Sequence, residues 1–196
     1  MEPRMFNHSR GLWGYTGAHR SDGEPLTIQS TGLGGPSAAI VLEELAALGL
    51  RRAIRVGTAS ALEGTLALGE LLVVERALCA DGTSAALGAL GEVEADATLL
   101  AALAREGGGS VASGTVVSSD LIYETAEERI EGWRERGARA LELPSAALFA
   151  LGARRQVALG CVVVISARIG SEERIEAEAL AQAGLAAGAL AAAALA

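Results

Sequence analysis

The stretch that decides the fold runs from Ser30 to Leu62 and reads STGLGGPSAAIVLEELAALGLRRAIRVGTASAL. It opens on the glycine-rich turn Thr31–Gly35, and Pro36 follows where a missing amide N–H costs the first turn of a helix nothing. Apolar residues then recur at helical spacing until Gly49, which ends the predicted helix. The apolar run Ala53–Val56 that comes next is typical of a strand, so this stretch predicts a helix between two strands.

The same alternation of strands and helices continues along the chain. Strands are predicted at Leu26–Ser30, Leu71–Val74, Val111–Val117 and Val157–Ser166, and helices at Ala97–Arg105, from a capping box of Thr125 and Glu128 to about Arg136, and at Leu141–Leu151. The last strand is apolar throughout, which indicates that both of its faces are covered, as in a central α/β sheet. We therefore predict one α/β domain over residues 1–196.

Composition narrows the class of protein. The chain has 196 residues, of which 51% are apolar, so it is long enough to bury a core without disulfides or metals. Its formal net charge is −8, and all 16 basic residues are arginine. A negative chain of this kind argues against nucleic acid as a partner, because nucleic-acid binding needs a basic surface.

The residues that most often hold metals or form disulfides are scarce. Cys79 and Cys161 are far apart and lie in apolar surroundings, which gives neither a metal spacing nor a disulfide framework. His8 and His19 lie near the start of the chain, where we expect surface residues rather than metal ligands or the base of a catalytic triad. We expect no metal and a reducing cytoplasm.

Both ends of the chain bear on targeting. The start, MEPRMFNHSR, has no apolar core of a signal peptide. Residues 179–196 carry no charge and approach the length of a membrane span. Alanine and glycine dominate there and the leucines are thinly spread, so we expect a terminal helix packed on the domain and no membrane.

Arg55 is the most informative charged residue. It lies inside an apolar strand that runs into the turn of Gly57 and Thr58, where a charge is costly unless a carboxylate or an anion pairs with it. Two interpretations stay open on spacing alone, a salt bridge to a glutamate or a phosphate site. The glycines of the turn before the first helix, Gly34 among them, allow a ligand to approach the backbone, but a tight turn needs them too.

Four motifs in order resemble the nucleoside phosphorylase family, in the branch of the uridine phosphorylases and the hexameric bacterial purine nucleoside phosphorylases. They are the opening stretch, with its glycine loop and Arg-Val-Gly-Thr turn, then LGELLVVERALCADGTS, SSDLIY and ALELPSAALFALG, which begin at Leu68, Ser118 and Ala140. The resemblance implies a three-layer α/β/α fold with a central mixed sheet. It also implies phosphorolysis, in which phosphate attacks the anomeric carbon of a nucleoside and releases a free base, with phosphate as co-substrate and no cofactor.

The resemblance also assigns residues. It places Arg55, Thr58, Gly34 and, from a neighbouring subunit, Arg10 at the phosphate, which implies a homodimer or a hexamer made of three dimers. Glu142 and Leu143 match the first two members of a Glu-Met-Glu ribose motif. Ile122 stands where an aromatic ring stacks on the base, and Arg168 and Arg129 match arginines that would contact a pyrimidine base. Arg129 has an alternative interpretation as an exposed helix residue paired with a glutamate.

Three departures from the family pattern leave other functions open. Pro144 replaces the second ribose glutamate, Ala167 stands where the purine enzymes carry a general acid, and the family's opening strand with its Gly-Asp-Pro-x-Arg loop is missing ahead of Arg10. Two functions stay open: an active phosphorylase, with uridine slightly favoured as substrate, and a catalytically impaired family member that binds nucleoside or phosphate or serves as a structural oligomer. A hydrolytic nucleosidase fits less well, because the phosphate-binding arginines are retained.

Overall fold

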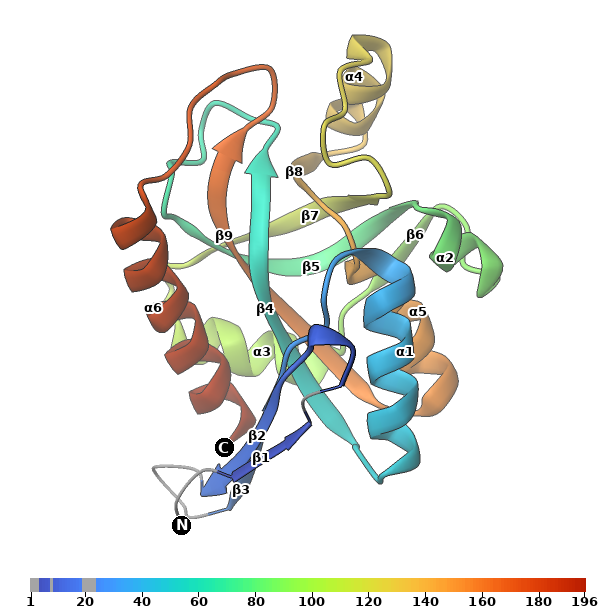
Figure 1. Ribbon diagram of the computed structural model, residues 1–196. Coiled ribbons are helices and arrows are strands. Elements are labelled where there is room, and N and C mark those ends of the chain that lie inside the picture. Colours follow the sequence, from blue (N-terminus) through green and yellow to red (C-terminus); the bar gives the residue numbers. More distant parts are fainter. Residues whose placement is uncertain (1–3, 8, 19–23) are drawn as a thin grey trace.

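The computed structural model describes residues 4–7, 9–18 and 24–196, without the side chains of Phe6, Ser9 and Ala18 (Figure 1). Within this part of the chain, the central sheet is built from Arg52–Ala61 (β4), Leu71–Ala80 (β5), Glu92–Glu94 (β6), Ala112–Ser119 (β7), Ala138–Glu142 (β8) and Ala158–Arg168 (β9). Their order is β6-β5-β7-β8-β4-β9, and β5 also pairs with β9, so the sheet closes on itself. Parallel pairs (β4 with β9, β5 with β7, β7 with β8) stand beside antiparallel ones (β4 with β8, and β5 with β6 and with β9), which makes the sheet mixed.

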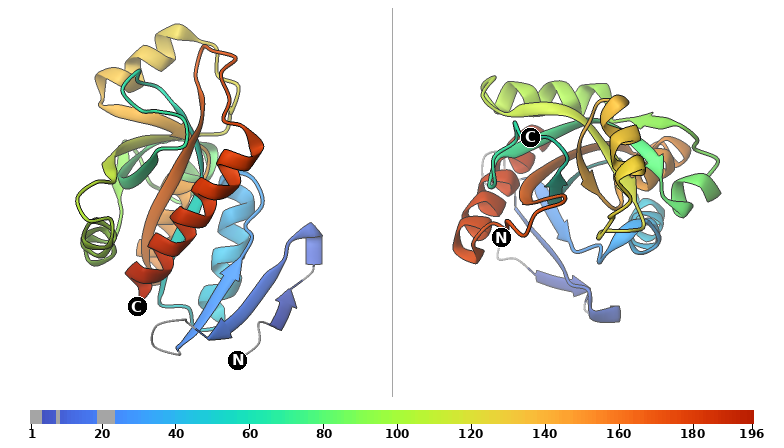
Figure 2. Two further views of the ribbon diagram at one scale, coloured as in Figure 1. Left: turned by 90° about the vertical axis from the view of Figure 1, so that its left-hand side faces the viewer. Right: turned by 90° about the horizontal axis from the view of Figure 1, so that it is seen from above.

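Helices cover both faces of this sheet (Figure 2). They are Gly34–Ala47 (α1), Gly82–Ala86 (α2), Ala97–Glu106 (α3), Glu127–Glu135 (α4), Ser145–Arg155 (α5) and Ala177–Leu195 (α6). α1 and α5 pack together over one face, around a core that includes Leu42, Phe149 and Cys161. α3 and α6 cover the other face, where Leu103 and Val164 are buried. The structure confirms the three-layer α/β/α fold with a mixed sheet.

A smaller sheet lies apart from the central one. It consists of Arg4–Asn7 (β1), Gly14–Ala18 (β2) and Pro25–Gln29 (β3), all antiparallel, with the short 3₁₀ turn Ser9–Gly11 between the first two. The predicted strand at Leu26–Ser30 is therefore confirmed as β3, but it does not join the central sheet. From β3 the chain passes through the glycine-rich turn into α1, as the sequence predicts, and α1 ends before Gly49, whose φ of 98° suits glycine.

Two local predictions are wrong. Leu141 does not begin a helix: it belongs to β8, and α5 starts only at Ser145, because Pro144 lies at the N-cap and parallel pairing with β7 holds the preceding residues extended. The capping box at Thr125 does not form either. Ala126 is the N-cap of α4 and has no side-chain cap, and the carboxylate of Glu124 instead accepts hydrogen bonds from the N–H groups of Thr125 and Ala126, at 3.0 and 2.9 Å.

The terminal helix α6 is long and apolar enough to cross a membrane by length and composition. One of its faces nevertheless belongs to the core of this domain: Ala187, Ala191 and Ala194 are buried there, and α6 contacts α3, β4 and β9. This packing confirms the predicted terminal helix that lies on the domain (Figure 1).

Candidate functional site

The centre of the candidate site is the carboxylate of Glu142, where β8 ends. After this residue the chain turns at Pro144 and enters α5, so the N–H of Ser145 points back to the carboxylate and donates to Oε1 and Oε2, at 3.0 and 3.2 Å. The first N–H groups of a helix lack partners within the helix and carry the positive end of its dipole, so they favour an anion. The side chain of Glu142 has no exposed surface, and burial of a charge there requires partners of this kind.

Ser118 supplies the second partner. It lies near the end of β7, opposite Glu142 in the parallel pairing with β8, and its hydroxyl donates to Oε1 of Glu142. The same hydroxyl accepts a hydrogen bond of 2.8 Å from the N–H of Ala146, in the first turn of α5. Ser118 therefore connects the end of β7, the carboxylate and the start of the helix.

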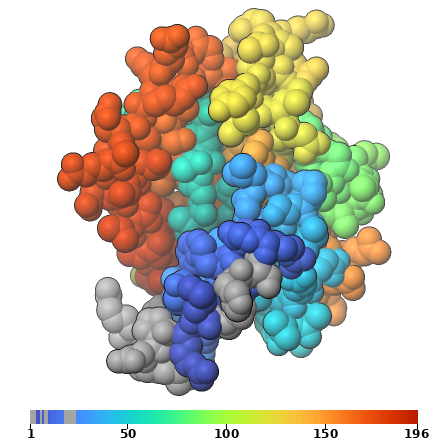
Figure 3. All heavy atoms as spheres, in the orientation of Figure 1, coloured from blue at the N-terminus to red at the C-terminus, as the bar shows by residue number. Residues whose placement is uncertain are grey.

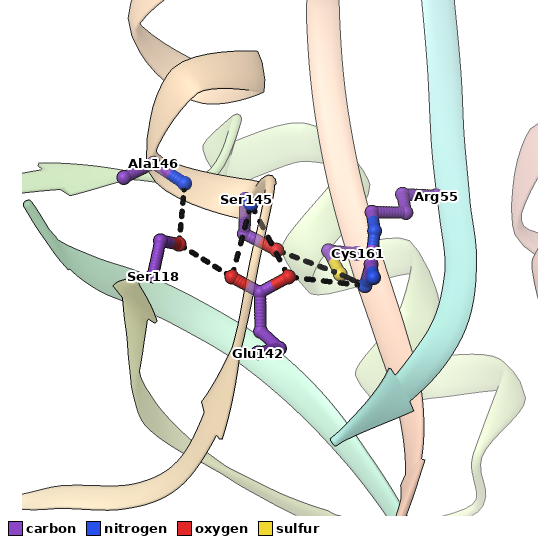
Figure 4. A network of polar contacts seen from close by, with 6 residues as sticks. All are labelled: Arg55, Ser118, Glu142, Ser145, Ala146 and Cys161. Atoms are coloured by element: carbon purple, nitrogen blue, oxygen red, sulfur yellow. Dashed lines mark hydrogen bonds and ion pairs between the residues drawn. The ribbon is translucent and has the colours of Figure 1, made fainter. Parts of the chain in front are cut away.

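Arg55 supplies the positive charge. Its Nη1 lies 3.3 Å from Oε2 of Glu142 and donates to Sγ of Cys161 at 3.5 Å (Figure 4). Cys161 stands opposite Arg55 in the parallel pairing of β4 with β9, and its thiol also meets the hydroxyl of Ser145, at 3.4 Å. Burial disfavours the guanidinium charge, but the Glu142 carboxylate and Cys161 outweigh it, so the pKa of Arg55 lies above its ordinary value. Burial raises the pKa of the Cys161 thiol.

Gly57 lets the guanidinium reach this position. A Cβ at residue 57 would lie 2.4 Å from Nη2 and 2.5 Å from Cζ of Arg55, closer than any side-chain carbon can approach. The predicted turn at Gly57 and Thr58 is wrong, because parallel pairing with β9 keeps both residues extended inside β4. The absence of a side chain at Gly57 leaves room for the guanidinium of Arg55 that lies over it.

The strand that carries Arg55, β4, lies partly at the surface. Figure 3 shows this strand at the surface between the C-terminal segments, in orange and red, and α1, in blue. Arg55 keeps 15% of its side chain exposed, whereas Glu142 is fully enclosed. The side chain of Arg55 is therefore partly exposed, while the carboxylate that it pairs with is buried.

Comparison with known proteins places this arrangement in a family. The family model described as "Phosphorylase superfamily" matches residues 2–196. The chain belongs to the phosphorylase superfamily. It is similar to a guanosine phosphorylase of Halorubrum lacusprofundi, with 32% identity over 76% of this chain and 63% of the relative, and to uridine phosphorylase of Escherichia coli, with 30% identity over 82% of this chain and 71% of the relative. The chain thus spans about two thirds of the length of these curated relatives.

Two further comparisons agree. A DeoD-type purine nucleoside phosphorylase of Streptococcus uberis is 33% identical over 81% of this chain and 69% of its own. Among solved structures, a uridine phosphorylase of Vibrio fischeri ES114 superposes with a TM-score of 0.87 at 27% identity, covering 99% of this chain and 82% of that one. The superfamily fold and the predicted family are therefore shown together.

The phosphorylase motif residues predicted around phosphate do not all come together in this chain. Arg55 pairs with Glu142, so the salt bridge to a glutamate, the first of the two interpretations given above, is present. The phosphate site stays a prediction. Thr58 lies on the same strand and is exposed, but side chains three residues apart in a strand leave opposite faces. Gly34, with a φ of 75°, is the first residue of α1. Arg10 makes an exposed ion pair with Glu44 of α1, 2.7 Å from its Oε1.

The residues predicted to contact sugar and base also have protein partners or stand at the surface. Arg168 donates to the carbonyl oxygens of Glu63 and Leu66, at 2.8 and 3.1 Å, so it holds the loop between β4 and β5. Arg129 pairs with Glu124 at 2.5 Å, as its alternative interpretation predicts.

The loop after β7 and the turn before α5 carry the remaining predicted contacts. Ile122 is exposed in the loop after β7, and Leu143 is partly exposed in the turn before α5. The histidines His8 and His19 lie outside the described residues.

Sequence reasoning missed three partners in the site. Ser118, Ser145 and Cys161 carry no signal of their own: two are ordinary small residues, and the cysteine lies in an apolar run. The one available signal is that Ser118 and Ser145 fall in motifs that resemble the family's, whereas Cys161 is brought to Arg55 only by the pairing of β4 with β9.

Proposed function

We propose that this chain is a nucleoside phosphorylase, a pentosyltransferase of nucleoside metabolism. Phosphate forms a bond to the anomeric carbon of the sugar, the glycosidic bond to the base breaks, and its electron pair leaves with the base. The products are a free base and a pentose 1-phosphate. Membership in the superfamily and relatives named guanosine, uridine and purine nucleoside phosphorylase support this reaction.

The observation that carries the proposal is the state of Arg55. Its Nη1 is committed to Glu142 and Cys161, whereas no hydrogen bond to the described residues engages its Nε or Nη2. A guanidinium has five donors in a fixed plane, so one edge can be held by the protein while the other binds an oxyanion. Since Glu142 holds the guanidinium in place, Arg55 is prepared to bind the phosphate co-substrate.

The electrostatic task of such a site is well defined. The sugar develops positive charge as the glycosidic bond breaks. Phosphate must therefore be held beside the anomeric carbon with one oxygen free to attack it. We place phosphate on Arg55, with Gly34 and the Arg10 of a neighbouring subunit as further contacts; the Thr58 side chain leaves the opposite face of β4 and is left out of this arrangement. The Glu142 carboxylate is enclosed and faces Arg55, so we propose that it acts by orienting this arginine, and that Leu143 contacts the sugar.

The base is assigned by what the chain lacks. Ala167 cannot protonate a purine, which favours a pyrimidine nucleoside such as uridine. We propose that Ile122 packs on the base; the guanidinium groups of Arg168 and Arg129 already have protein partners, so they are left out of this contact. No cofactor or metal is needed for this reaction, and we propose a cytoplasmic homodimer or a hexamer of three dimers, independent of nucleic acid and of membranes.

The test is a panel of purine and pyrimidine nucleosides incubated with and without phosphate, with free base measured by chromatography. The proposal expects phosphate-dependent release that falls at least a hundredfold in Arg55→Ala. Arg52→Ala is the matched control, because Arg52 is an exposed arginine on the same strand. Folding of each variant is checked by circular dichroism and size-exclusion chromatography.

Each outcome has one meaning. Release that depends on phosphate and on Arg55 supports the phosphorylase, and the best nucleoside gives its specificity. Release that is independent of phosphate indicates a hydrolase. No release from any nucleoside by the folded protein contradicts the proposal and favours the catalytically impaired relative, for which Pro144 in the sugar motif gives a physical reason.

A further inference from the structure

Ser118 takes no part in the proposed reaction itself. Its contacts instead hold the carboxylate that pairs with Arg55. Its hydroxyl is fully buried, donates to Oε1 of Glu142 and accepts from the N–H of Ala146. A hydroxyl used as donor and acceptor at once has one orientation only. It therefore fixes one oxygen of the carboxylate relative to the first turn of α5.

The other oxygen of the same carboxylate faces Arg55. Oε2 lies 3.3 Å from Nη1, and the N–H of Ser145 bridges both oxygens. Because the carboxylate is a rigid plane, fixing Oε1 fixes the direction in which Oε2 presents its charge. Without the hydroxyl, Oε1 would keep only the bridging N–H, and the carboxylate could rotate about its last side-chain bond.

We infer that Ser118 is a positioning residue for the phosphate half of the site, acting through Glu142 on the guanidinium of Arg55. This inference rests on the proposed function, in which Arg55 binds phosphate. Removal of a residue that directly supports a metal ligand typically lowers metal affinity by about 10- to 100-fold. Ser118 supports Arg55 through Glu142, one contact further out, so we expect an effect at the lower end of that range. Ser118 affects the binding of phosphate and not of the nucleoside, because it acts only through Glu142 on Arg55, the residue that binds phosphate.

The experiment compares Ser118→Ala with a matched serine on the same strand. Ser113 also donates its hydroxyl to a carboxylate, Oε1 of Glu75 at 2.6 Å, but it is exposed and has no contact with the site. Initial rates are measured against phosphate at saturating nucleoside, and against nucleoside at saturating phosphate. We expect Ser118→Ala to raise the KM for phosphate about tenfold and to leave the KM for nucleoside within about twofold, with Ser113→Ala unchanged in both.

Two more substitutions at Ser118 separate positioning from a loss of packing. Ser118→Thr keeps the hydroxyl and is expected to restore most of the phosphate affinity, and Ser118→Cys, with a weaker donor, is expected to fall between wild type and alanine. Should Ser118→Ala fail to fold, the cysteine variant decides by the same criterion. An unchanged KM for phosphate, or an equal rise in both KM values, overturns the inference.

Binding of inorganic phosphate, measured by isothermal titration calorimetry, distinguishes this inference from the proposed function. If wild type binds phosphate but cleaves no nucleoside, the proposed reaction fails, and a roughly tenfold weaker affinity in Ser118→Ala than in Ser113→Ala still supports positioning. Equal affinities in the two variants overturn it. A wild-type protein that binds no phosphate overturns both the inference and the proposed function.

Discussion

The buried pair of Arg55 and Glu142 predicts an asymmetry between two single substitutions. The two charges are 3.3 Å apart, but the arginine side chain keeps 15% of its surface exposed and the glutamate keeps none. Arg55→Met leaves a carboxylate that water cannot reach. Glu142→Gln leaves a guanidinium that water can partly solvate. We therefore expect the first change to destabilise the protein more than the second.

The magnitudes follow from the geometry. Two unit charges at this distance attract by about 5 kcal/mol at an effective dielectric constant of about 20. In Arg55→Met the carboxylate of Glu142 keeps its hydrogen bonds from Ser118 and Ser145, which offset part of this loss. We expect a cost of about 3–4 kcal/mol, in the range measured when one partner of a buried pair is removed. Glu142→Gln retains the shape and one acceptor oxygen, and its expected cost is about 2 kcal/mol.

The assay is urea denaturation followed by circular dichroism, with the free energy of unfolding extrapolated to water. The double variant with Met at 55 and Gln at 142 completes a thermodynamic cycle, and it should cost about 2 kcal/mol less than the sum of the two single variants. Arg52→Met, on the exposed part of the same strand, is the control and should change stability by less than about 0.5 kcal/mol. Equal costs for the two single variants, a larger cost for Glu142→Gln, or simple additivity would refute the reasoning.

Three further predictions test neighbouring parts of the structure. Gly57→Ala brings a Cβ against the guanidinium of Arg55 and should lower the free energy of unfolding in urea by about 1–3 kcal/mol. Gly64→Ala is the control and should be nearly neutral, because nothing lies within 4 Å of its added Cβ. Similar losses of stability in the two variants would contradict the close contact. Hydrogen bonding from the N–H of Ala126 and the charge of Arg129 lower the pKa of Glu124, so its carboxylate stabilises the folded state above its ordinary pKa and loses this effect as the pH falls through the lowered value. The melting temperature of Glu124→Gln should accordingly lie below that of wild type near neutral pH and converge with it in acid, and a constant difference would count against this account. Burial raises the pKa of the Cys161 thiol, so mass spectrometry after iodoacetamide treatment at about pH 8 should find it unmodified until the protein is unfolded in urea; rapid alkylation of the native protein would show that the site opens.

The sequence predicted the elements whose signals are local. The apolar run Val157–Ser166 appears as the buried strand β9, and the turn with Pro36 leads into α1, because proline geometry and apolar periodicity act within a few residues. Leu141 was assigned to the wrong element for the opposite reason. Its short segment is apolar enough for either structure, and pairing with β7, a partner distant in the chain, makes it a strand.

The candidate site divides in the same way. The local pattern marked Arg55 as a charge in an apolar strand that needs a partner, and the family motifs marked Glu142. Neither indicated that the two would meet, or that Ser118 and Cys161 would join them. These contacts arise from the register of β4 on β9 and of β7 on β8, and each register depends on the packing of the whole sheet.

The amino-acid sequence alone thus determined the α/β class, the order of most elements and the charged residue that needs compensation. The tertiary structure decided which carboxylate compensates it and which serine and cysteine join that pair. The physical reason is range. The patterns that predict a helix or a strand depend on neighbouring residues. The partners of a buried charge lie on strands that are distant in the chain and meet only when the core packs.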